Sequence, residues 1–448
     1  MKKILSTTLF IMLLGTLGFA APIDKTIKSS GINRDGISIS VKNIDNGKVV
    51  YKLNEKRPAS PASNQKIITL SATLDTLGED YNYSTKLFKN NKNELYLQLG
   101  ADPYFTTDDL NKLFKEASQK GITEPKAIYI DDTIFDSIEW SKHWSWGDDL
   151  LESMPRISAY NIDNNRIKII ITPTQKGEPA NIYIEEPYPV ISYINLVVTG
   201  RKLKSVRFSR NFDISPEIIN IEGVIDSQVE KLIPIIHPKR YFIVKLENAL
   251  KNAKINYYGN IENKEIIHPE DFELISEINH PLSIAIDDIL KNSNNLALES
   301  SYKIAGGKFT NDRGTIKNSQ KMLNAFFEKY QINAEDTQFV DGCGVSKYNL
   351  VTTDFMTDFL IKSPTKKILM EHLPAPGEGT LHDRMLYFKN NLRAKTGSLD
   401  DLANLTGYIT TKHGKTYAFS IIINDPKSNY AEKKSLHEYI VRTIYEKY

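Results

Sequence analysis

Two short stretches near the start of the chain, residues 36–41 and 48–53, alternate between apolar and polar side chains. Alternation with a period of two is typical of β-strands that bury one face. The turn-forming sequence Asp45-Asn46-Gly47 lies between the two stretches, so the pattern predicts a β-hairpin. Three more strands are predicted near the other end of the chain, at 393–397, 402–411 and 417–424.

Helical patterns separate these two groups of strands. A helix is predicted from about Ser63 to Gly78, and residues 282–305 carry apolar side chains on one side. A polar turn at 292–295 interrupts that second pattern and divides it into two helices. Amphipathic helices are also predicted at 316–330 and 429–446.

The middle of the chain differs from both ends, because short strand patterns separated by turn residues dominate it. One helix, 108–119, lies among them. The aromatic and acidic sequence 144–149 is compatible either with the lining of a cleft or with a packed corner. The strands of this part are predicted at 95–99, 127–130, 166–171, 195–198 and 219–225.

Together these patterns predict an α+β multidomain protein. Residues 21–80 and 269–448 form one discontinuous domain, in which the first strand pair joins the three last strands in a sheet covered by helices. Residues 81–268 form an inserted strand-rich region, which we expect to contain two nested domains. The chain shows no internal repeat.

Composition narrows the class of protein. Of the 448 residues, 40% are hydrophobic and 25% are charged, which is ordinary for a soluble globular protein. A net charge of +2 without a long basic run argues against nucleic acid as a partner. Cys343 is the only cysteine, so no intramolecular disulfide is possible, and a structural role between two glycines is expected for it.

The first 20 residues have the pattern of a secretory signal peptide. Lys2 and Lys3 precede a largely apolar stretch, and small residues end it at Ala20. An uncleaved membrane anchor is the alternative interpretation. No later stretch reaches the roughly 20 apolar residues of a spanning helix, so we expect a periplasmic or otherwise extracytoplasmic protein without a transmembrane anchor after cleavage.

The predicted start of the helix at 63–78 carries the first candidate for chemistry. Ser63 and Lys66 are three residues apart, so a helix places them on one face. A serine hydroxyl becomes a nucleophile when a neighbouring base removes its proton, and a desolvated lysine is such a base. The spacing is a weak signal alone, because Ser363 and Lys366 repeat it where Ser363 is expected only to cap a helix.

Two further triplets follow in the chain. Ser293-x-Asn295 lies in the polar turn between two helices, where both side chains are able to point at one cavity. The same pattern at Ser209-x-Asn211 has no catalytic residue types beside it. Lys395-Thr396-Gly397 occurs once, on a predicted strand that we expect inside the sheet, where it offers a fixed cation, a hydroxyl and a close backbone approach.

In this order the three triplets resemble the signatures of the D-alanyl-D-alanine carboxypeptidase/endopeptidase family of low-molecular-mass penicillin-binding proteins, in the branch with a large insertion between the first two signatures. The resemblance covers essentially the whole mature chain. It implies a penicillin-binding/serine β-lactamase-like transpeptidase domain, an antiparallel sheet flanked by helices, with inserted strand-rich domains. The local matches are Pro61-Ala62-Ser63-Asn64-Gln65-Lys66, Asp341-Gly342-x-Gly344-x-Ser346, Gly379-Thr380-Leu381-x-x-Arg384 and Ala394-Lys395-Thr396-Gly397-Ser398-Leu399.

This sequence departs from the family at two of these positions. Cys343 stands where the family usually has serine, which leaves the polarity of that loop open. Ser398 stands where threonine is usual, and it keeps the hydroxyl.

The resemblance implies acyl transfer to serine. Ser63 would attack the bond between two terminal D-alanines, Lys66 would act as its base and Ser293 would pass a proton to the leaving amine. The substrate would be bound by Asn295, Lys395, Thr396 and Ser398. Peptidoglycan stem peptides ending in D-Ala-D-Ala are the expected substrates, and β-lactams the expected covalent inhibitors.

Two other functional classes stay open: a β-lactamase or esterase on the same scaffold, and a non-catalytic cell-wall scaffold protein. No cofactor is expected, and no metal either, because the eight histidines show no ligand spacing. The sequence allows a homodimer without indicating one.

Overall fold

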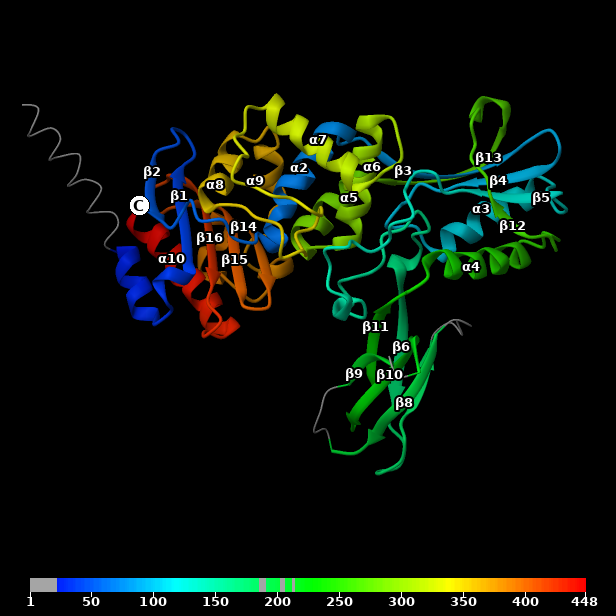
Figure 1. The fold of residues 1–448 in the computed structure, drawn as a ribbon, viewed down its shortest axis with the longest axis horizontal. Coiled ribbons are helices and arrows are strands. Elements are labelled where there is room, and N and C mark those ends of the chain that lie inside the picture. The colour runs from blue at the N-terminus through cyan, green and yellow to red at the C-terminus, as the bar shows by residue number, and fades with distance from the viewer. Residues whose placement is uncertain (1–21, 185–190, 202–205, 212–213) are drawn as a thin grey trace, which may run out of the picture. The chain divides into compact units, whose positions relative to one another are not determined.

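The computed structural model describes residues 22–184, 191–201, 206–211 and 214–448 (Figure 1). The predicted signal peptide, residues 1–20, lies outside the described residues. Contacts divide the chain into two compact units, one of Met1–Tyr81 with Pro281–Tyr448 and one of Asn82–His280. No helix in the described part of the chain has the length and apolar character that crossing a bilayer demands.

The first unit contains a five-stranded antiparallel sheet, in which the predicted hairpin from the start of the chain joins three strands from its end. The hairpin strand β1 (Ile37–Asn43) pairs with β16 (Thr416–Asn424), and the order across the sheet is β14-β15-β16-β1-β2. The other strands are β2 (Val49–Leu53), β14 (Leu392–Leu399) and β15 (Leu402–Thr410).

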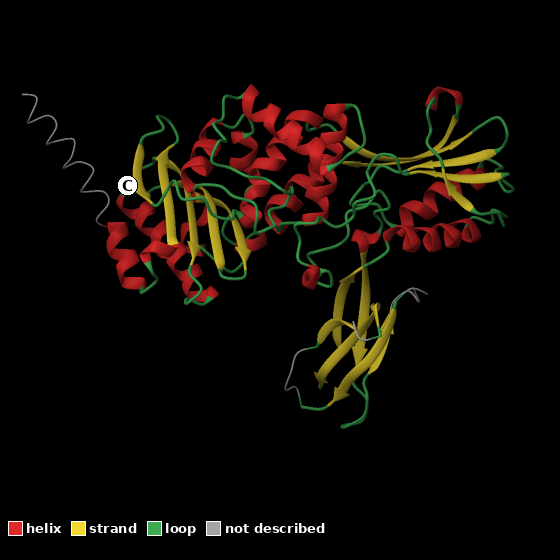
Figure 2. Ribbon diagram, viewed as in Figure 1, coloured by secondary structure: helices red, strands yellow, loops and turns green. Residues whose placement is uncertain are grey.

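Helices cover both faces of this sheet (Figure 2). On one face, Ile440 of α10 (Tyr430–Lys447) and Ile23 of the helix at 22–30 share a core cluster with Ile39 and Phe419 of the sheet. On the other face α8 (Thr353–Lys362) packs against β1 and β16. Burial of the apolar face of each element stabilises this layered arrangement.

A group of helices beside the sheet surrounds α2 (Lys66–Leu77), whose residues are buried on nearly every side. A helix buried all round belongs to the centre of a domain. Gly78 ends α2 with a φ of +85°, a conformation that favours glycine. The neighbouring helices are α5 (Leu282–Asp287), η6 (Asp288–Asn292), α6 (Asn295–Thr310), α7 (Ile316–Lys329) and α9 (Lys366–His372).

The second unit is built on another five-stranded sheet, of order β12-β5-β4-β3-β13, with α3 (Thr107–Gln119) and α4 (Pro238–Asn252) packed against each other. Its last strand, β13 (Glu273–Pro281), keeps the chain in this unit up to His280. The sequence patterns had placed that boundary at residue 268. The other strands of the sheet are β3 (Asn82–Lys89), β4 (Glu94–Gln98), β5 (Ala127–Asp131) and β12 (Ile261–Asn263).

Between β5 and β12 the chain forms two three-stranded sheets, of order β8-β10-β9 and β11-β6-β7. β5 precedes this segment and β12 follows it, and the two strands pair with each other. The segment is therefore an insertion between two neighbouring strands of the five-stranded sheet. The strands of the segment are β6 (Arg166–Thr172), β7 (Asn181–Ile184), β8 (Ser192–Thr199), β9 (Arg207–Asn211), β10 (Ser215–Ile225) and β11 (Val229–Pro234).

Candidate active site

Ser63 lies in a short 3₁₀ helix, η2 (Ala62–Gln65), directly before the first residue of α2. The preceding residue, Ala62, has a φ of +45° although it is not glycine. Such strain costs of order 1 kcal/mol or more and persists only where the surroundings impose it. One such restraint is the side-chain amide of Asn64, which donates to the hydroxyl of Thr406 on β15 at 2.8 Å.

The amine of Lys66 lies beside the Ser63 hydroxyl. Its Nζ donates to Ser63 Oγ at 3.0 Å and to the carbonyl oxygen of Cys343 at 2.8 Å. The side chain is fully buried. Burial lowers the pKa of the Lys66 amine below its ordinary value, although the neighbouring Cys343, Asp341 and Glu299 act in the opposite direction. A lysine in this setting is suited to losing its proton and accepting one from a hydroxyl.

Lys395 places a second buried amine near the first. It lies on β14, is 0% exposed, and its Nζ donates to the carbonyl of Thr396 at 3.2 Å. Burial and the positive charge of Lys66 hold the pKa of Lys395 well below its ordinary value. Two like charges in a buried site disfavour double protonation, so the charge of Lys66 favours the neutral form of Lys395.

β14 is an edge strand of its sheet, and the expectation of an inner strand is wrong. The reason is that the hairpin joins the sheet at β16, on the side away from β14. An edge strand leaves main-chain N–H and C=O groups available to a further extended peptide.

Gly397 brings β14 close to the turn that carries Ser63. A Cβ atom at this position would lie 2.9 Å from the carbonyl oxygen of Pro61, so glycine permits the approach. Of the neighbouring hydroxyl residues on β14, Thr396 is half-buried and Ser398 is exposed.

Ser293 and Asn295 lie where η6, a π-helix, meets α6, and both of these helices pack against α2. Ser293 adopts the left-handed conformation, with a φ of 64°. Within the described residues, its hydroxyl makes no hydrogen bond to Ser63 or Lys66. Asn294 caps α6 through its side chain, which accepts from Ala297 N at 3.0 Å. The structure therefore joins Ser63 and Lys66 by a hydrogen bond, places Lys395 within electrostatic reach of Lys66, and places the Ser-x-Asn pair on elements packed against the same helix.

A glycine-punctuated loop, residues 341–346, completes this site from another side. Gly344 has a φ of +83°, and a Cβ atom there would lie 2.0 Å from the carbonyl oxygen of Ala62. Asp341 Oδ1 accepts from Gly344 N and its Oδ2 accepts from Ser346 N, both at 2.8 Å. The loop is thus folded around one buried carboxylate, and it contacts the residue directly before Ser63.

Glu299, which belongs to none of the sequence motifs, lies under this loop. It is 1% exposed, and its Oε1 accepts from Gly342 N at 2.7 Å and Cys343 N at 2.6 Å. With Asp341 and Cys343 it forms a group of potential metal ligands within 4.8 Å of one another. The carboxylates of Glu299 and Asp341 already accept main-chain N–H groups of the loop, so this cluster anchors the loop. No local sequence pattern marks this residue, because the main-chain N–H group of Gly342 that its carboxylate accepts lies 43 residues later in the chain.

The duplicate motifs lie in different settings. Ser363 ends α8 and its Oγ accepts from Thr365 N at 3.3 Å, while Thr365 is the N-cap of α9. The expectation that Ser363 caps the following helix is therefore wrong. Ser209 and Asn211 belong to β9 of the second unit.

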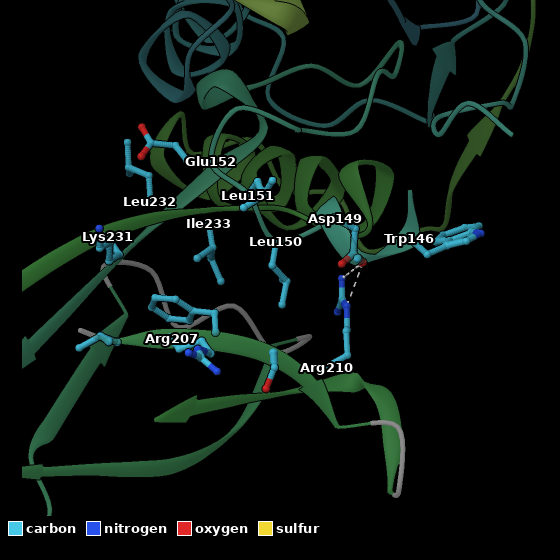
Figure 3. Close-up of a pocket in the computed structure, with 14 residues that line it drawn as sticks. Trp146, Asp149, Leu150, Leu151, Glu152, Arg207, Arg210, Lys231, Leu232 and Ile233 are labelled. Carbon is cyan, nitrogen blue, oxygen red and sulfur yellow. Dashed lines mark hydrogen bonds and ion pairs between the residues drawn. The ribbon is translucent and has the colours of Figure 1, made fainter. Parts of the chain in front are cut away.

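A separate pocket of about 690 Å³ lies within the second unit (Figure 3). Trp146 is exposed at its edge, whereas Trp144 is buried against Trp140, so the sequence 144–149 both lines a cavity and forms a packed corner. Arg210 and Asp149 form a buried ion pair at 2.5 Å there.

The fold and this cluster of a serine and two buried lysines define the class of penicillin-binding and serine β-lactamase-like proteins. The model of the D-Ala-D-Ala carboxypeptidase 3 (S13) family matches residues 19–444. The chain therefore belongs to this family and is a serine-type peptidase, which confirms the resemblance and the fold class predicted from the sequence.

Two relatives and one solved structure illustrate the similarity. A D-alanyl-D-alanine carboxypeptidase DacB of Haemophilus influenzae is 23% identical over 97% of this chain and 96% of its own length. A D-alanyl-D-alanine carboxypeptidase of an Actinomadura species is 25% identical over 90% of this chain and 80% of its own. The crystal structure of penicillin binding protein 4 from Haemophilus influenzae superposes with a TM-score of 0.80, at 22% identity, over 91% of this chain and 95% of that one.

Proposed function

We propose that Ser63 is the nucleophile of a D-Ala-D-Ala carboxypeptidase reaction and that the first unit is its catalytic domain. The observation that carries the proposal is the 3.0 Å contact between Lys66 Nζ and Ser63 Oγ. This distance lies within the reach of direct proton transfer. Ser63 attacks the carbonyl between two terminal D-alanines, forms an acyl-enzyme and releases D-alanine, and water then hydrolyses the acyl-enzyme.

Lys66 acts as the base in this proposal because burial lowers the pKa of its amine and so favours the neutral form, which can accept a proton. Its contact with the Cys343 carbonyl uses one N–H, which leaves the amine able to face Ser63. When a substrate carboxylate approaches Lys395, its negative charge favours the protonated form of that amine, which then binds the carboxylate.

Lys395, Thr396 and Ser398 are proposed to bind the free carboxylate of the substrate. They offer one cation and two hydroxyls along an edge strand, which suits a peptide that ends in a carboxylate and lies antiparallel to β14. The backbone N–H groups of Ser63 and Ser398 are proposed to bind the oxyanion. Donors of this kind contribute on the order of 3 kcal/mol each to stabilisation of the transition state.

Ser293 is proposed to pass the proton to the departing amine, and Asn295 to bind the substrate amide. The strained backbone at Ser293 and the π-helix before it support a functional role, because both features concentrate at functional sites. Ser293 is half-buried where η6 meets α6, so part of its side chain is accessible to a bound substrate.

The natural substrates are proposed to be peptidoglycan stem peptides ending in D-Ala-D-Ala, with cross-linked peptides as a second, endopeptidase substrate and β-lactams as covalent inhibitors. This assignment places the enzyme outside the cytoplasm, in the periplasm or an equivalent compartment. It is supported by the pattern of a secretory signal peptide and by the names of the relatives.

The test is release of D-alanine from an N-acylated tripeptide ending in D-Ala-D-Ala. The wild-type chain should release it, and Ser63→Ala should abolish release. Ser363→Ala is the matched control, because it removes a serine with the same spacing to a lysine, and the hydroxyl of that serine contacts Thr365 instead of a lysine amine. The same peptide with a C-terminal amide should be a poor substrate, because it lacks the carboxylate proposed to contact Lys395.

Equal release by wild type and Ser63→Ala would refute the assignment of the nucleophile. Equal cleavage of the acid and the amide peptide would refute the proposed role of Lys395, Thr396 and Ser398. Cleavage of a purified cross-linked peptide dimer tests the endopeptidase activity separately.

A further inference from the structure

The loop around Cys343 is held from two sides, and one of them is the helix that carries Lys66. Three successive carbonyl oxygens of the loop accept hydrogen bonds from side chains of that segment. These bonds run from Gln65 to the Asp341 carbonyl, from Thr69 to the Gly342 carbonyl at 2.8 Å, and from Lys66 to the Cys343 carbonyl at 2.8 Å.

The other side of the loop is held by Glu299 of α6. The N–H groups of Gly342 and Cys343 both donate to Glu299 Oε1, at 2.7 and 2.6 Å, and the Cys343 thiol donates to the same carboxyl group. A carboxylate that accepts main-chain N–H groups in a buried site makes stronger bonds than a neutral acceptor does. Glu299 therefore fixes the peptide plane between Gly342 and Cys343 and the orientation of the residue that follows it.

We infer that Glu299 is a positioning residue for the reaction: by fixing the 342–343 peptide it holds the Cys343 carbonyl against the Lys66 amine and thereby directs that amine at Ser63. This inference rests on the proposed function. Glu299 touches neither of the two reacting side chains in the proton transfer, and its effect passes through the main chain of the loop.

Geometry explains why such an anchor matters. The Lys66 side chain has four rotatable bonds, and its amine makes one hydrogen bond to Ser63 and one to the loop. If the Cys343 carbonyl turned away, the amine would lose the partner that fixes its direction. A misplacement of about 1 Å in a reacting group lowers a rate by about 10²-fold.

Glu299 also brings a negative charge close to Lys66, and this charge distinguishes its role from that of a residue that only packs against the loop. Burial and the charge of Asp341 raise the pKa of Glu299 to about 7. Its negative charge favours the protonated form of Lys66. The remaining titratable groups that face this cluster are Asp341 and Cys343 of the loop and Tyr302 of α6.

The experiment measures the rate constant for acylation of Ser63 by benzylpenicillin between pH 5 and pH 10. Wild type, Glu299→Gln and Glu299→Ala are compared, with Glu328→Gln as the matched control, an exposed glutamate of α7 in the same unit. Thermal melting establishes that each variant is folded. Acylation requires Lys66 to be neutral, so the acid limb of the profile reports its pKa, and in the wild type also the titration of Glu299.

Glu299→Ala should lower the maximal rate by about 10²-fold, because the loop loses its anchor. Glu299→Gln keeps the shape and one acceptor but removes the charge, so its acid limb should move to lower pH, a displacement that lost packing alone does not produce. Glu328→Gln should match wild type in both respects.

The inference is overturned if both Glu299 variants are folded and acylate with the rate and pH profile of wild type. If neither variant folds, Thr69→Val decides. It removes the bond to the Gly342 carbonyl without changing charge, and it should lower the maximal rate while leaving the acid limb in place. An unchanged rate in Thr69→Val would count against the loop as a positioning device. If wild type itself is not acylated at Ser63, the proposed function fails instead.

Discussion

Gly344→Ala tests whether the loop at 341–346 sets the position of Ser63. Gly344 has a φ of +83°, and the added Cβ would lie 2.0 Å from the carbonyl oxygen of Ala62. Contacts of a Cβ atom below 3.0 Å are essentially never seen, so the loop and the Ala62 peptide must separate by about 1 Å. Ala62 directly precedes Ser63, so the displacement reaches the nucleophile.

The magnitude has two parts. An alanine in the left-handed region costs about 1–2 kcal/mol of folding free energy. The displacement adds a functional cost, because about 1 Å of misplacement at a reacting group corresponds to about a 10²-fold lower rate. We therefore expect a folded, mildly destabilised protein whose acylation by benzylpenicillin is slower by about that factor.

Gly414→Ala is the matched control. Gly414 has a similar φ of +73° in the turn between β15 and β16, but a Cβ atom there meets nothing within 4 Å. This variant should lose a comparable amount of stability in thermal or urea unfolding and acylate at the rate of wild type. Rates of acylation are read from intact mass after quenching, at matched protein concentration.

Two results would refute the reasoning. Acylation of folded Gly344→Ala at the wild-type rate would show that the loop does not position Ser63. Equal slowing in Gly414→Ala and Gly344→Ala would show that loss of stability, and not the clash with Ala62, causes the effect.

Three further predictions concern charge. Burial and the charge of Arg384 lower the pKa of His437 to about 3. The free energy of unfolding should therefore fall by about 2 kcal/mol between pH 6.5 and pH 5, because only the unfolded chain takes up a proton in this range. His437→Leu should remove this pH dependence in urea titrations. Lys395→Met should slow acylation by benzylpenicillin, because it removes the amine proposed to bind the carboxylate of the ligand; an unchanged rate would contradict that role. Asp149→Ala should cost about 3 kcal/mol in calorimetry by removing a partner of buried Arg210, and a loss below 1 kcal/mol would contradict this.

Local patterns were sufficient to predict the sheet of the first unit. Its strands alternate or are continuously apolar, and tight turns such as the one at Gly414 separate them, so both features are readable within a few residues. The contact between Ser63 and Lys66 was also predictable, because helical spacing alone brings them to one face.

Other features depend on contacts between distant parts of the chain. Helix α4 was not predicted, because its apolar run from Tyr241 to Val244 resembles a strand, and packing against α3 favours the helix. The edge position of β14 follows from where the hairpin joins the sheet. Glu299 is buried because main-chain N–H groups more than 40 residues later satisfy its carboxylate, and no local pattern reports that.

The most direct test of the central claim is mass spectrometry of the mature protein after incubation with benzylpenicillin. We predict one covalent adduct, with the mass of the intact penicillin, on the peptide that contains Ser63, and no adduct on folded Ser63→Ala. The peptide that contains Ser363 should stay unmodified. Absence of any adduct on folded wild-type protein, or an adduct that persists in Ser63→Ala, would contradict the account.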